Sequence, residues 1–582
     1  MLIAGGDIGG TLSPIPVPLA TSTISTATAE IYEALIDAFS VVGSLDTARE
    51  AVATAVALPN NKILFAGGSH CYAKNYGPGG LCGTTLYKGF QCDALNTAEL
   101  YSEGSPGSFA LAGANSGGTM TTARSGATAT LIKGSGTSLD NKVLITGGST
   151  GSTYLSLSSP PPGCGPEVAG QFGQVAQNTA EIYDPVADTF TATGTIPGCA
   201  AGTLPPGCGL PATCGGPESP ITAATESGTT VTITSAVTGL ILGDNVTVSG
   251  ITCSSGCPGN GWNGIYPVTA IGTGTFSYTA AASLGTPILT NGYASAGTAQ
   301  CGLVDSSAQL LNNGQVLVTG GDYLVFLGQA SQQSFIYDPS SATFTQTVPM
   351  NVARELPGIT ILPSGKVLVL GGVTAEAAAC AATPATPVDF ITNYSAEIYD
   401  PTAVTWTLTP GSSATPGAPG GMSVQRIVSA ELFTTGTDSG LVIVAGGVNS
   451  GTTNGGNPEV PNFGTCESTA NISQATTTAT DLFDERTGLF TPTGALHQSR
   501  GGYGYSILNA GSNSGDLLVV GGECAGGGLS SWAIGSAAAT SCDSTATKDY
   551  YELYSPSTGT WTLGTALPAS TPANSPQSAL LQ

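Results

Sequence analysis

A short apolar run that stops at a glycine pair recurs along the chain. Each run is about five residues long, rich in Val, Ile and Leu, and closed by two glycines. This pattern is typical of a buried strand that ends where the backbone needs space or a positive φ. We therefore predict seven equivalent buried strands, which end at Gly5–Gly6, Gly67–Gly68, Gly147–Gly148, Gly320–Gly321, Gly371–Gly372, Gly446–Gly447 and Gly521–Gly522.

Three further motifs complete each repeat. After each glycine pair and a connection of variable length comes a motif of the form Ala-Glu-Ile-Tyr-Asp-Pro, as at Ala396–Pro401. A tight turn then leads to a Thr-rich stretch with a central aromatic residue, such as Trp406. An arginine usually opens the segment that runs to the next glycine pair. We predict four strands per repeat: the first led by arginine, the second ending at the glycine pair, the third carrying the Tyr-Asp motif, and the fourth carrying the aromatic residue.

The order Gly-Gly, Tyr-Asp-Pro, Trp or Phe, and Arg resembles the kelch repeat in its bacterial form. The resemblance covers nearly the whole chain apart from one insertion. Kelch repeats form the four-stranded blades of β-propellers. The resemblance therefore implies an all-β fold, a seven-bladed kelch-type β-propeller built from residues 1–196 and 301–582.

The two ends of the chain complement each other. Residues 1–4 form a second strand with no first strand before it, whereas the C-terminal Ser578–Gln582 is similar to the first-strand segment Ser307–Leu311. We predict that both ends pair in one blade, which removes two open sheet edges. Exchange of this terminal strand between molecules would be a route to self-assembly.

Residues 197–300 interrupt the repeats. Polar and apolar residues alternate with period two from Val231 to Tyr278. We predict that this insertion is a small, cysteine-containing all-β module.

Composition narrows the class of protein. With 41% hydrophobic and only 9% charged residues the chain should fold. Its net charge of −24 disfavours nucleic acid and anionic membrane surfaces as partners. No apolar run approaches the roughly 18 residues of a membrane span. No signal peptide precedes Met1, and we expect a processed or truncated N-terminus.

The 14 cysteines lie in loop-like sequence and are even in number, which favours disulfides and an extracellular or cell-surface location. Candidates for pairing share one predicted connection or lie in equivalent connections of adjacent repeats: Cys524 with Cys542; Cys71, Cys82 and Cys92 among themselves; Cys253 with Cys257; Cys380 with Cys466.

Connection lengths predict two unlike faces. Turns between first and second strands, and between third and fourth strands, are short. The connections from second to third strands, and from fourth to first strands, hold the long segments. Variable connections on a rigid scaffold commonly bind ligands, so we expect a protein or polysaccharide ligand at the long-loop face.

Candidate ligand-binding residues gather on this long-loop face. The arginines that open first strands either bind anionic groups at the channel mouth or bond carbonyls of the blades, as the resemblance implies. The two histidines are candidates for a metal or acid–base role, with inert surface positions as the alternative. These residues are Arg49, Arg124, Arg354, Arg426, Arg500, His70 and His497.

No catalytic motif is evident. The galactose and glyoxal oxidases have similar propellers, and their copper site uses a Tyr-His neighbour pair. The chain has no such pair, and His70-Cys71-Tyr72 comes nearest. We predict no cofactor, although the acidic residues after the glycine pairs, Asp7, Asp322 and Glu523, leave calcium or another cation open. The sequence favours a non-catalytic binding or structural module for adhesion or assembly, with a carbohydrate-directed enzyme or lectin as the alternative.

Overall fold

The structure is a computed structural model, and it describes residues 1–5, 25–50, 55–76, 87–104, 106–156, 175–197, 219–235, 245–253, 264–272, 274–279, 287–296, 303–321, 330–375, 390–412, 420–424, 426, 428–452, 472–522, 550–567 and 577–579. The chain divides into two compact units, Met1–Ile196 with Gly302–Gln582, and Pro197–Cys301. The described residues form strands and one 3-10 turn, Ala114–Ser116, so this part of the chain is all-β. None of the helical segments described is long and apolar enough to cross a membrane.

Seven sheets of the first unit share one antiparallel path, from first to fourth strand. We number them I to VII along the chain. They are sheet I, β42 (Gln577–Ala579), β1 (Leu2–Ala4), β2 (Ala29–Glu33), β3 (Ala38–Val41); sheet II, β4 (Val56–Ala57), β5 (Lys62–Ala66), β8 (Ala98–Ser102), β9 (Ser108–Leu111); sheet III, β10 (Ser125–Leu131), β11 (Val143–Thr150), β14 (Ala180–Asp184), β15 (Thr189–Ala192); sheet IV, β22 (Ser307–Leu310), β23 (Val316–Thr319), β24 (Ser334–Asp338), β25 (Thr343–Gln346); sheet V, β26 (Gly358–Ile361), β27 (Val367–Leu370), β30 (Ala396–Asp400), β31 (Thr405–Leu408); sheet VI, β32 (Glu431–Leu432), β33 (Leu441–Ala445), β36 (Thr480–Asp484), β37 (Leu489–Pro492); and sheet VII, β38 (Gly504–Ile507), β39 (Leu517–Val520), β40 (Tyr550–Ser555), β41 (Thr560–Ala566).

The second strands are the most deeply buried elements. All four residues of β23, β27 and β39 are buried, because both faces of each sheet pack against neighbouring sheets. These strands are the apolar runs before the glycine pairs, so the predicted core strands are confirmed at these positions.

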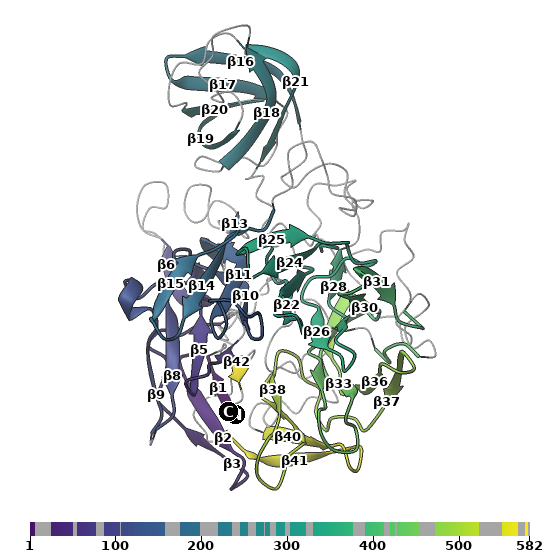
Figure 1. Cartoon of the computed structure of the whole chain (residues 1–582). Helices are drawn as coiled ribbons and strands as arrows, with labels where there is room; N and C mark the ends of the chain where they lie inside the picture. Colours follow the sequence, from purple (N-terminus) through teal and green to yellow (C-terminus); the bar gives the residue numbers. More distant parts are fainter. Residues whose placement is uncertain are drawn as a thin grey trace. The chain divides into compact units, whose positions relative to one another are not determined.

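Apolar clusters join successive sheets of the first unit, and they also join the last sheet to the first. Ile3 of sheet I packs in one cluster with Leu518 and Val520 of sheet VII. Between sheets III and IV, the Thr193 hydroxyl and the Tyr337 hydroxyl form a 2.7 Å hydrogen bond. Figure 1 shows these sheets following one another in chain order around a common centre. The arrangement is compatible with a β-propeller.

The terminal strands pair as the sequence predicted. β1 pairs antiparallel with β42, with Leu2 opposite Ala579 and Ala4 opposite Gln577. The N-terminal strand therefore gains the neighbour that its own end of the chain does not supply.

The second unit is a closed barrel of six strands, β16 (Ser219–Ser227), β17 (Thr230–Ser235), β20 (Thr275–Thr279), β19 (Gly264–Gly272), β18 (Asn245–Cys253) and β21 (Pro287–Ala296). The alternation of Val231 and Ile233 with threonines places both apolar side chains inside, together with Phe276 and Tyr278.

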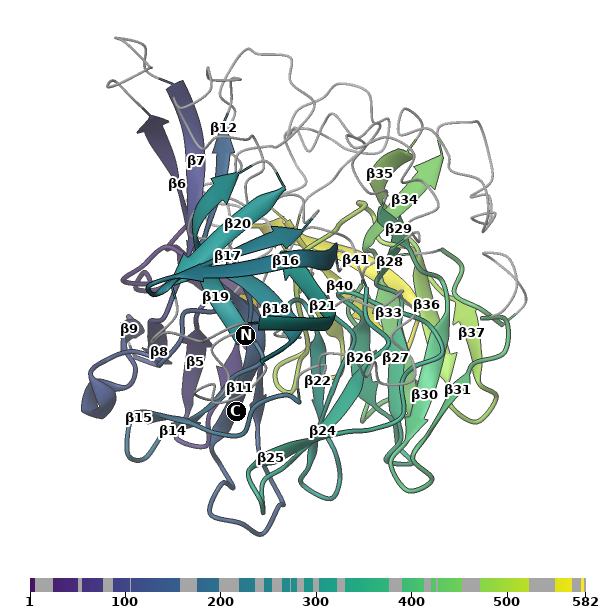
Figure 2. The same ribbon diagram turned by 90° about the horizontal axis from the view of Figure 1, so that it is seen from above.

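Additional strands extend several sheets beyond the glycine pairs. They lie in the connections from second to third strands: β6 (Ser69–Tyr76), β7 (Tyr87–Ala94), β12 (Ser152–Ser156), β13 (Val175–Ala176), β28 (Val373–Ala375), β29 (Phe390–Thr392), β34 (Val448–Thr452) and β35 (Ile472–Thr476). In Figure 2, β6, β7, β12, β34 and β35 project toward the same side of the first unit.

Candidate functional site

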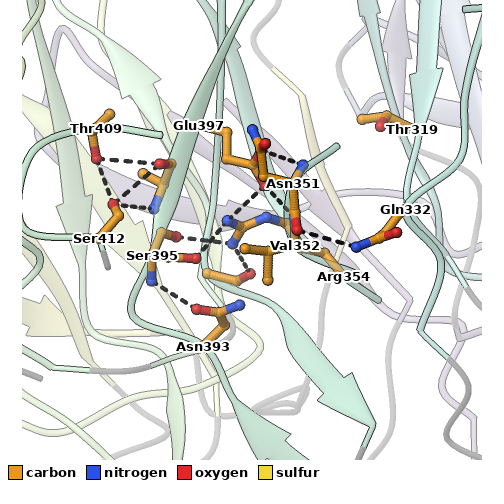
Figure 3. Close-up of polar contacts among 12 residues, drawn as sticks. Thr319, Gln332, Asn351, Val352, Arg354, Asn393, Ser395, Glu397, Thr409 and Ser412 are labelled. Atoms are coloured by element: carbon orange, nitrogen blue, oxygen red, sulfur yellow. Dashed lines mark hydrogen bonds and ion pairs between the residues drawn. The ribbon is translucent and has the colours of Figure 1, made fainter. Parts of the chain in front are cut away.

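A buried ion pair holds the start of the first strand in place, and sheet V shows it fully (Figure 3). Arg354 is completely buried, and its Nη1 donates to the carbonyls of Gly371 and Ser395 at 2.8 and 2.9 Å. Its Nη2 lies 3.3 Å from Oε1 of Glu397, which is also buried. Glu397 in turn accepts hydrogen bonds from the backbone N–H groups of Asn351 and Val352 at 2.7 and 3.0 Å. Burial lowers the pKa of Arg354, and the Glu397 charge opposes this shift.

The same ion pair recurs in four other sheets. In each, an arginine contacts the carbonyl of the first glycine of the pair and a carboxylate on the third strand. The pairs are Arg49–Glu99 at 2.6 Å, Arg124–Glu181 at 3.1 Å, Arg500–Glu552 at 3.1 Å, and Arg426–Asp481. The ten side chains are at most 1% exposed. Desolvation of this kind is tolerated because each charge is paired and hydrogen-bonded.

Four of these arginines, Arg124, Arg354, Arg426 and Arg500, also join two sheets through their backbone carbonyls. The carbonyl of Arg124, which precedes β10 of sheet III, accepts a hydrogen bond from the N–H of Gly68 in sheet II at 2.7 Å. Gly67 has a φ of +65°, and a Cβ on it would lie 2.4 Å from the same carbonyl. The glycine pair is therefore required by this close approach, since a side chain would collide with the neighbouring sheet.

Sheet IV replaces both members of the pair together. Leu303 occupies the arginine position, because its carbonyl accepts from the second glycine of the preceding sheet, Gly148, at 2.7 Å. In β24, Phe335 stands where the other third strands carry the carboxylate. Both side chains are buried, at 0% and 4% exposure. A buried charge without its partner is costly, and this sheet has neither charge.

The arginine geometry bears on the two roles that the sequence left open. All five guanidinium groups bond carbonyls and carboxylates within their own sheets, and none is exposed. The arrangement favours the structural role, and we do not assign these residues to ligand binding.

The two histidines lie on different sheets. His497 precedes Arg500, and its Nδ1 lies 3.1 Å from Oε2 of Glu552, so it belongs to the ion-pair cluster of sheet VII. His70 lies on β6, where its Nδ1 is 2.9 Å from the Ala48 carbonyl and its ring stacks on Tyr72.

One predicted disulfide is present among the described cysteines. Cys71 on β6 is bonded to Cys92 on β7, within one connection as expected. Cys253 ends β18, where it lies opposite Pro287 of β21. The other predicted cysteines and the acidic residues after glycine pairs lie outside the described residues: Cys82, Cys257, Cys380, Cys466, Cys524, Cys542, Asp7, Asp322 and Glu523.

The extension strands form the candidate binding face. β12, which follows the glycine pair of sheet III, pairs with β7, which belongs to the connection of sheet II. β29 and β34, from sheets V and VI, also contact each other. The extensions of sheets II and III are thus joined, and so are those of sheets V and VI.

One side of the β6–β7 hairpin carries a polar and aromatic cluster. The Tyr72 hydroxyl donates to Asp93 Oδ2 at 3.0 Å, and Gln91 Nε2 donates to Asp93 Oδ1 at 2.5 Å. His70 stacks on Tyr72 at 5.3 Å between ring centroids. We call these four residues the hairpin cluster. Sequence reasoning found His70 with Tyr72 nearby but missed Gln91 and Asp93, because only the pairing of β7 with β6 brings these two residues opposite Tyr72 and His70.

The fold and this face define an all-β protein of mostly four-stranded antiparallel sheets. No protein-family model and no curated protein matches the chain. Among solved structures, a chain described as "Structure of YjhT" is similar to it with 12% sequence identity and a TM-score of 0.38. The alignment covers 89% of this chain and 97% of that chain.

Proposed function

We propose that sheets I to VII are the blades of a seven-bladed kelch-type propeller. We also propose that the protein is a secreted or cell-surface module that binds a protein or polysaccharide, without catalysis, through its extension strands. The observation that carries this proposal is the pairing of β7 with β12 across two sheets. Isolated loops need no such pairing, whereas a shared binding surface requires neighbouring connections to be fixed relative to each other.

Charge supports a neutral or cationic partner. The five buried arginines are each neutralised by their own carboxylate. The net charge of −24 therefore belongs to the remaining residues, which carry few cations. Anionic polymers would be repelled by such a surface, whereas neutral glycans and basic protein segments would not.

The alternative is a carbohydrate-directed function, a lectin or enzyme, and the hairpin cluster favours it. An aromatic ring beside a carboxylate and an amide offers both a stacking surface and hydrogen-bond groups for sugar hydroxyls. The copper chemistry of the similar oxidase propellers needs a Tyr-His pair that this sequence lacks.

A binding screen against glycan and protein arrays tests the proposal, with variants on both faces. Tyr72→Ala should weaken or abolish binding of the ligand found. Val186→Ser, in the β14–β15 turn, should leave it unchanged, because Val186 is 94% exposed and belongs to a short turn. Loss of binding in Val186→Ser but not in Tyr72→Ala would refute the assignment of the face. Stoichiometric copper in the purified protein would favour the enzyme.

Self-assembly through the terminal strand is part of the same proposal. β42 pairs with three residues of β1, and the same pairing could be made with a second copy. Native mass measurement at low concentration distinguishes pairing within one chain from exchange between chains. A monomer that unfolds cooperatively argues against exchange. Defined oligomers that incorporate chains lacking residues 577–582 support it.

A further inference from the structure

Three side chains with metal-ligating atoms converge on the side of the β6–β7 hairpin opposite the hairpin cluster. Cys71 and Cys92 are directly opposite each other in the ladder between β6 and β7. Glu50 follows the buried Arg49, and its backbone pairs with Ser69 at the start of β6. One carboxylate oxygen and the two sulfurs lie within 4.8 Å of one another. Backbone pairing therefore places all three groups, and no long loop is needed to bring them together.

The approach of Glu50 to the disulfide is the unusual feature. Its Oε1 lies 2.7 Å from Cys71 Sγ, and Cys71 is completely buried. A disulfide sulfur carries no hydrogen, so it cannot donate a hydrogen bond to the carboxylate. A thiol would donate a hydrogen bond to it, and a cation bound to the sulfur would attract it more strongly.

We infer that the reduced form of this site binds a thiophilic divalent cation of the zinc type, through Cys71, Cys92 and Glu50. Thiolates and carboxylates are both ordinary zinc ligands, and the soft thiolates favour zinc over magnesium or calcium. The disulfide and the metal compete for the same two sulfurs, so the site is gated by oxidation.

The chemistry balances with a thiol or phosphine reductant. Such a reductant supplies two electrons to break the Cys71–Cys92 bond, and two protons from solvent complete the two thiols. Metal binding then displaces both thiol protons to solvent, leaving two thiolates and one carboxylate around the ion. Oxidation by a small-molecule disulfide, which takes up the two electrons and leaves as two thiolates, re-forms the Cys71–Cys92 bond, removes two ligands and releases the ion.

His70 is not a ligand in this arrangement, although it is adjacent to Cys71 in sequence. Successive strand residues point to opposite faces. His70 stacks on Tyr72, on the same side as Asp93, and its Nδ1 lies against the Ala48 carbonyl. A water molecule would complete four-coordination.

Cobalt(II) titration of the full chain, reduced with a phosphine under anaerobic conditions, tests the inference. Other cysteines can also bind cobalt, so the measured quantity is the difference between wild type and Cys71→Ser/Cys92→Ser, read from thiolate-to-cobalt charge-transfer absorption. Glu50→Gln keeps both cysteines. Glu355→Gln is its matched control, because Glu355 follows Arg354 and its backbone pairs with Val373 as Glu50 pairs with Ser69.

The reduced wild type should bind one more cobalt ion than the double serine variant, and the oxidised protein should lack that ion. Glu50→Gln should weaken this binding at least about tenfold. Removing a residue that only hydrogen-bonds to a metal ligand already costs about that much affinity, and Glu50 is a ligand itself. Glu355→Gln should leave it unchanged. Equal cobalt uptake by wild type and the double serine variant would overturn the inference, as would undiminished affinity in Glu50→Gln.

Discussion

Replacing Glu397 by Gln should be among the most damaging conservative changes in the chain. The substitution keeps the shape of the side chain but only one acceptor oxygen. It therefore removes the charge that neutralises Arg354 and one of the two backbone hydrogen bonds, from Asn351 to Oε2 or from Val352 to Oε1. Arginine cannot shed its proton to escape burial. An uncompensated buried charge of this kind costs about 3–5 kcal/mol. We therefore expect the unfolding free energy of the first unit to fall by that amount.

The same sheet supplies the control. Lys366 and Asp400 form a 3.0 Å ion pair, but their side chains are 43% and 25% exposed. Lys366→Met should cost less than about 1 kcal/mol, because solvent screens this pair. Urea denaturation followed by tryptophan fluorescence measures both variants against wild type.

The double variant Arg354→Met/Glu397→Gln decides whether charge is the cause. The double variant has no buried arginine charge left to neutralise, so it should be no less stable than Glu397→Gln alone. This should hold although the carbonyls of Gly371 and Ser395 lose their donor. If Glu397→Gln proves as mild as Lys366→Met, or if the double variant loses the sum of both single effects, the reasoning is refuted.

Three further changes should have effects of defined sign. Leu303→Arg should destabilise sheet IV by about 3–5 kcal/mol, and adding Phe335→Glu should recover a large part, as a double-mutant cycle would reveal. Val404→Gly should stabilise by about 1 kcal/mol in thermal unfolding, since Val404 has a φ of 54° where sheets VI and VII have glycine. Burial raises the pKa of Glu431 to about 7 from 4.5, so its contribution to stability is present below pH 4.5 and lost as pH rises through 7. Glu431→Gln should therefore exceed wild type in stability at pH 8 and differ little from it at pH 5; equal difference at both values would contradict this.

The core strands and the pairing of the chain ends were predictable because short sequence patterns mark both, although the chain ends themselves are far apart in sequence. A continuous apolar run such as Val316–Thr319 indicates a strand that is covered on both faces of its sheet. The glycine pair after it marks a close approach of backbones. The unmatched second strand at residues 2–4 needs a partner, and the C-terminal segment was the one with a first-strand pattern. The six-stranded barrel is different, because alternation in Val231–Ser235 predicts strands but not the order in which they close.

The role of the arginines could not be settled from position alone. A residue at the start of a first strand can face solvent or the interior, and its direction depends on whether the interior offers a carboxylate to pair with it. The signal was available in the third-strand motif, where the carboxylate of Ala-Glu-Ile-Tyr recurs with the arginine. The hairpin cluster had no comparable signal, because Asp93 and Tyr72 meet only through the register of β6 and β7.

Sheet IV shows what the ion pairs contribute. Its arginine and carboxylate positions are both apolar, yet Leu303 still accepts the hydrogen bond from Gly148 that links two sheets. The backbone link is therefore common to charged and apolar versions, and the charge pair is a separate means of fixing the same segment. Apolar replacements of buried ion pairs are often neutral in stability, whereas half-replacements are not. A buried arginine without its carboxylate, or a carboxylate without its arginine, would destabilise the sheet. We therefore expect the two charges to be lost together, as they are in sheet IV.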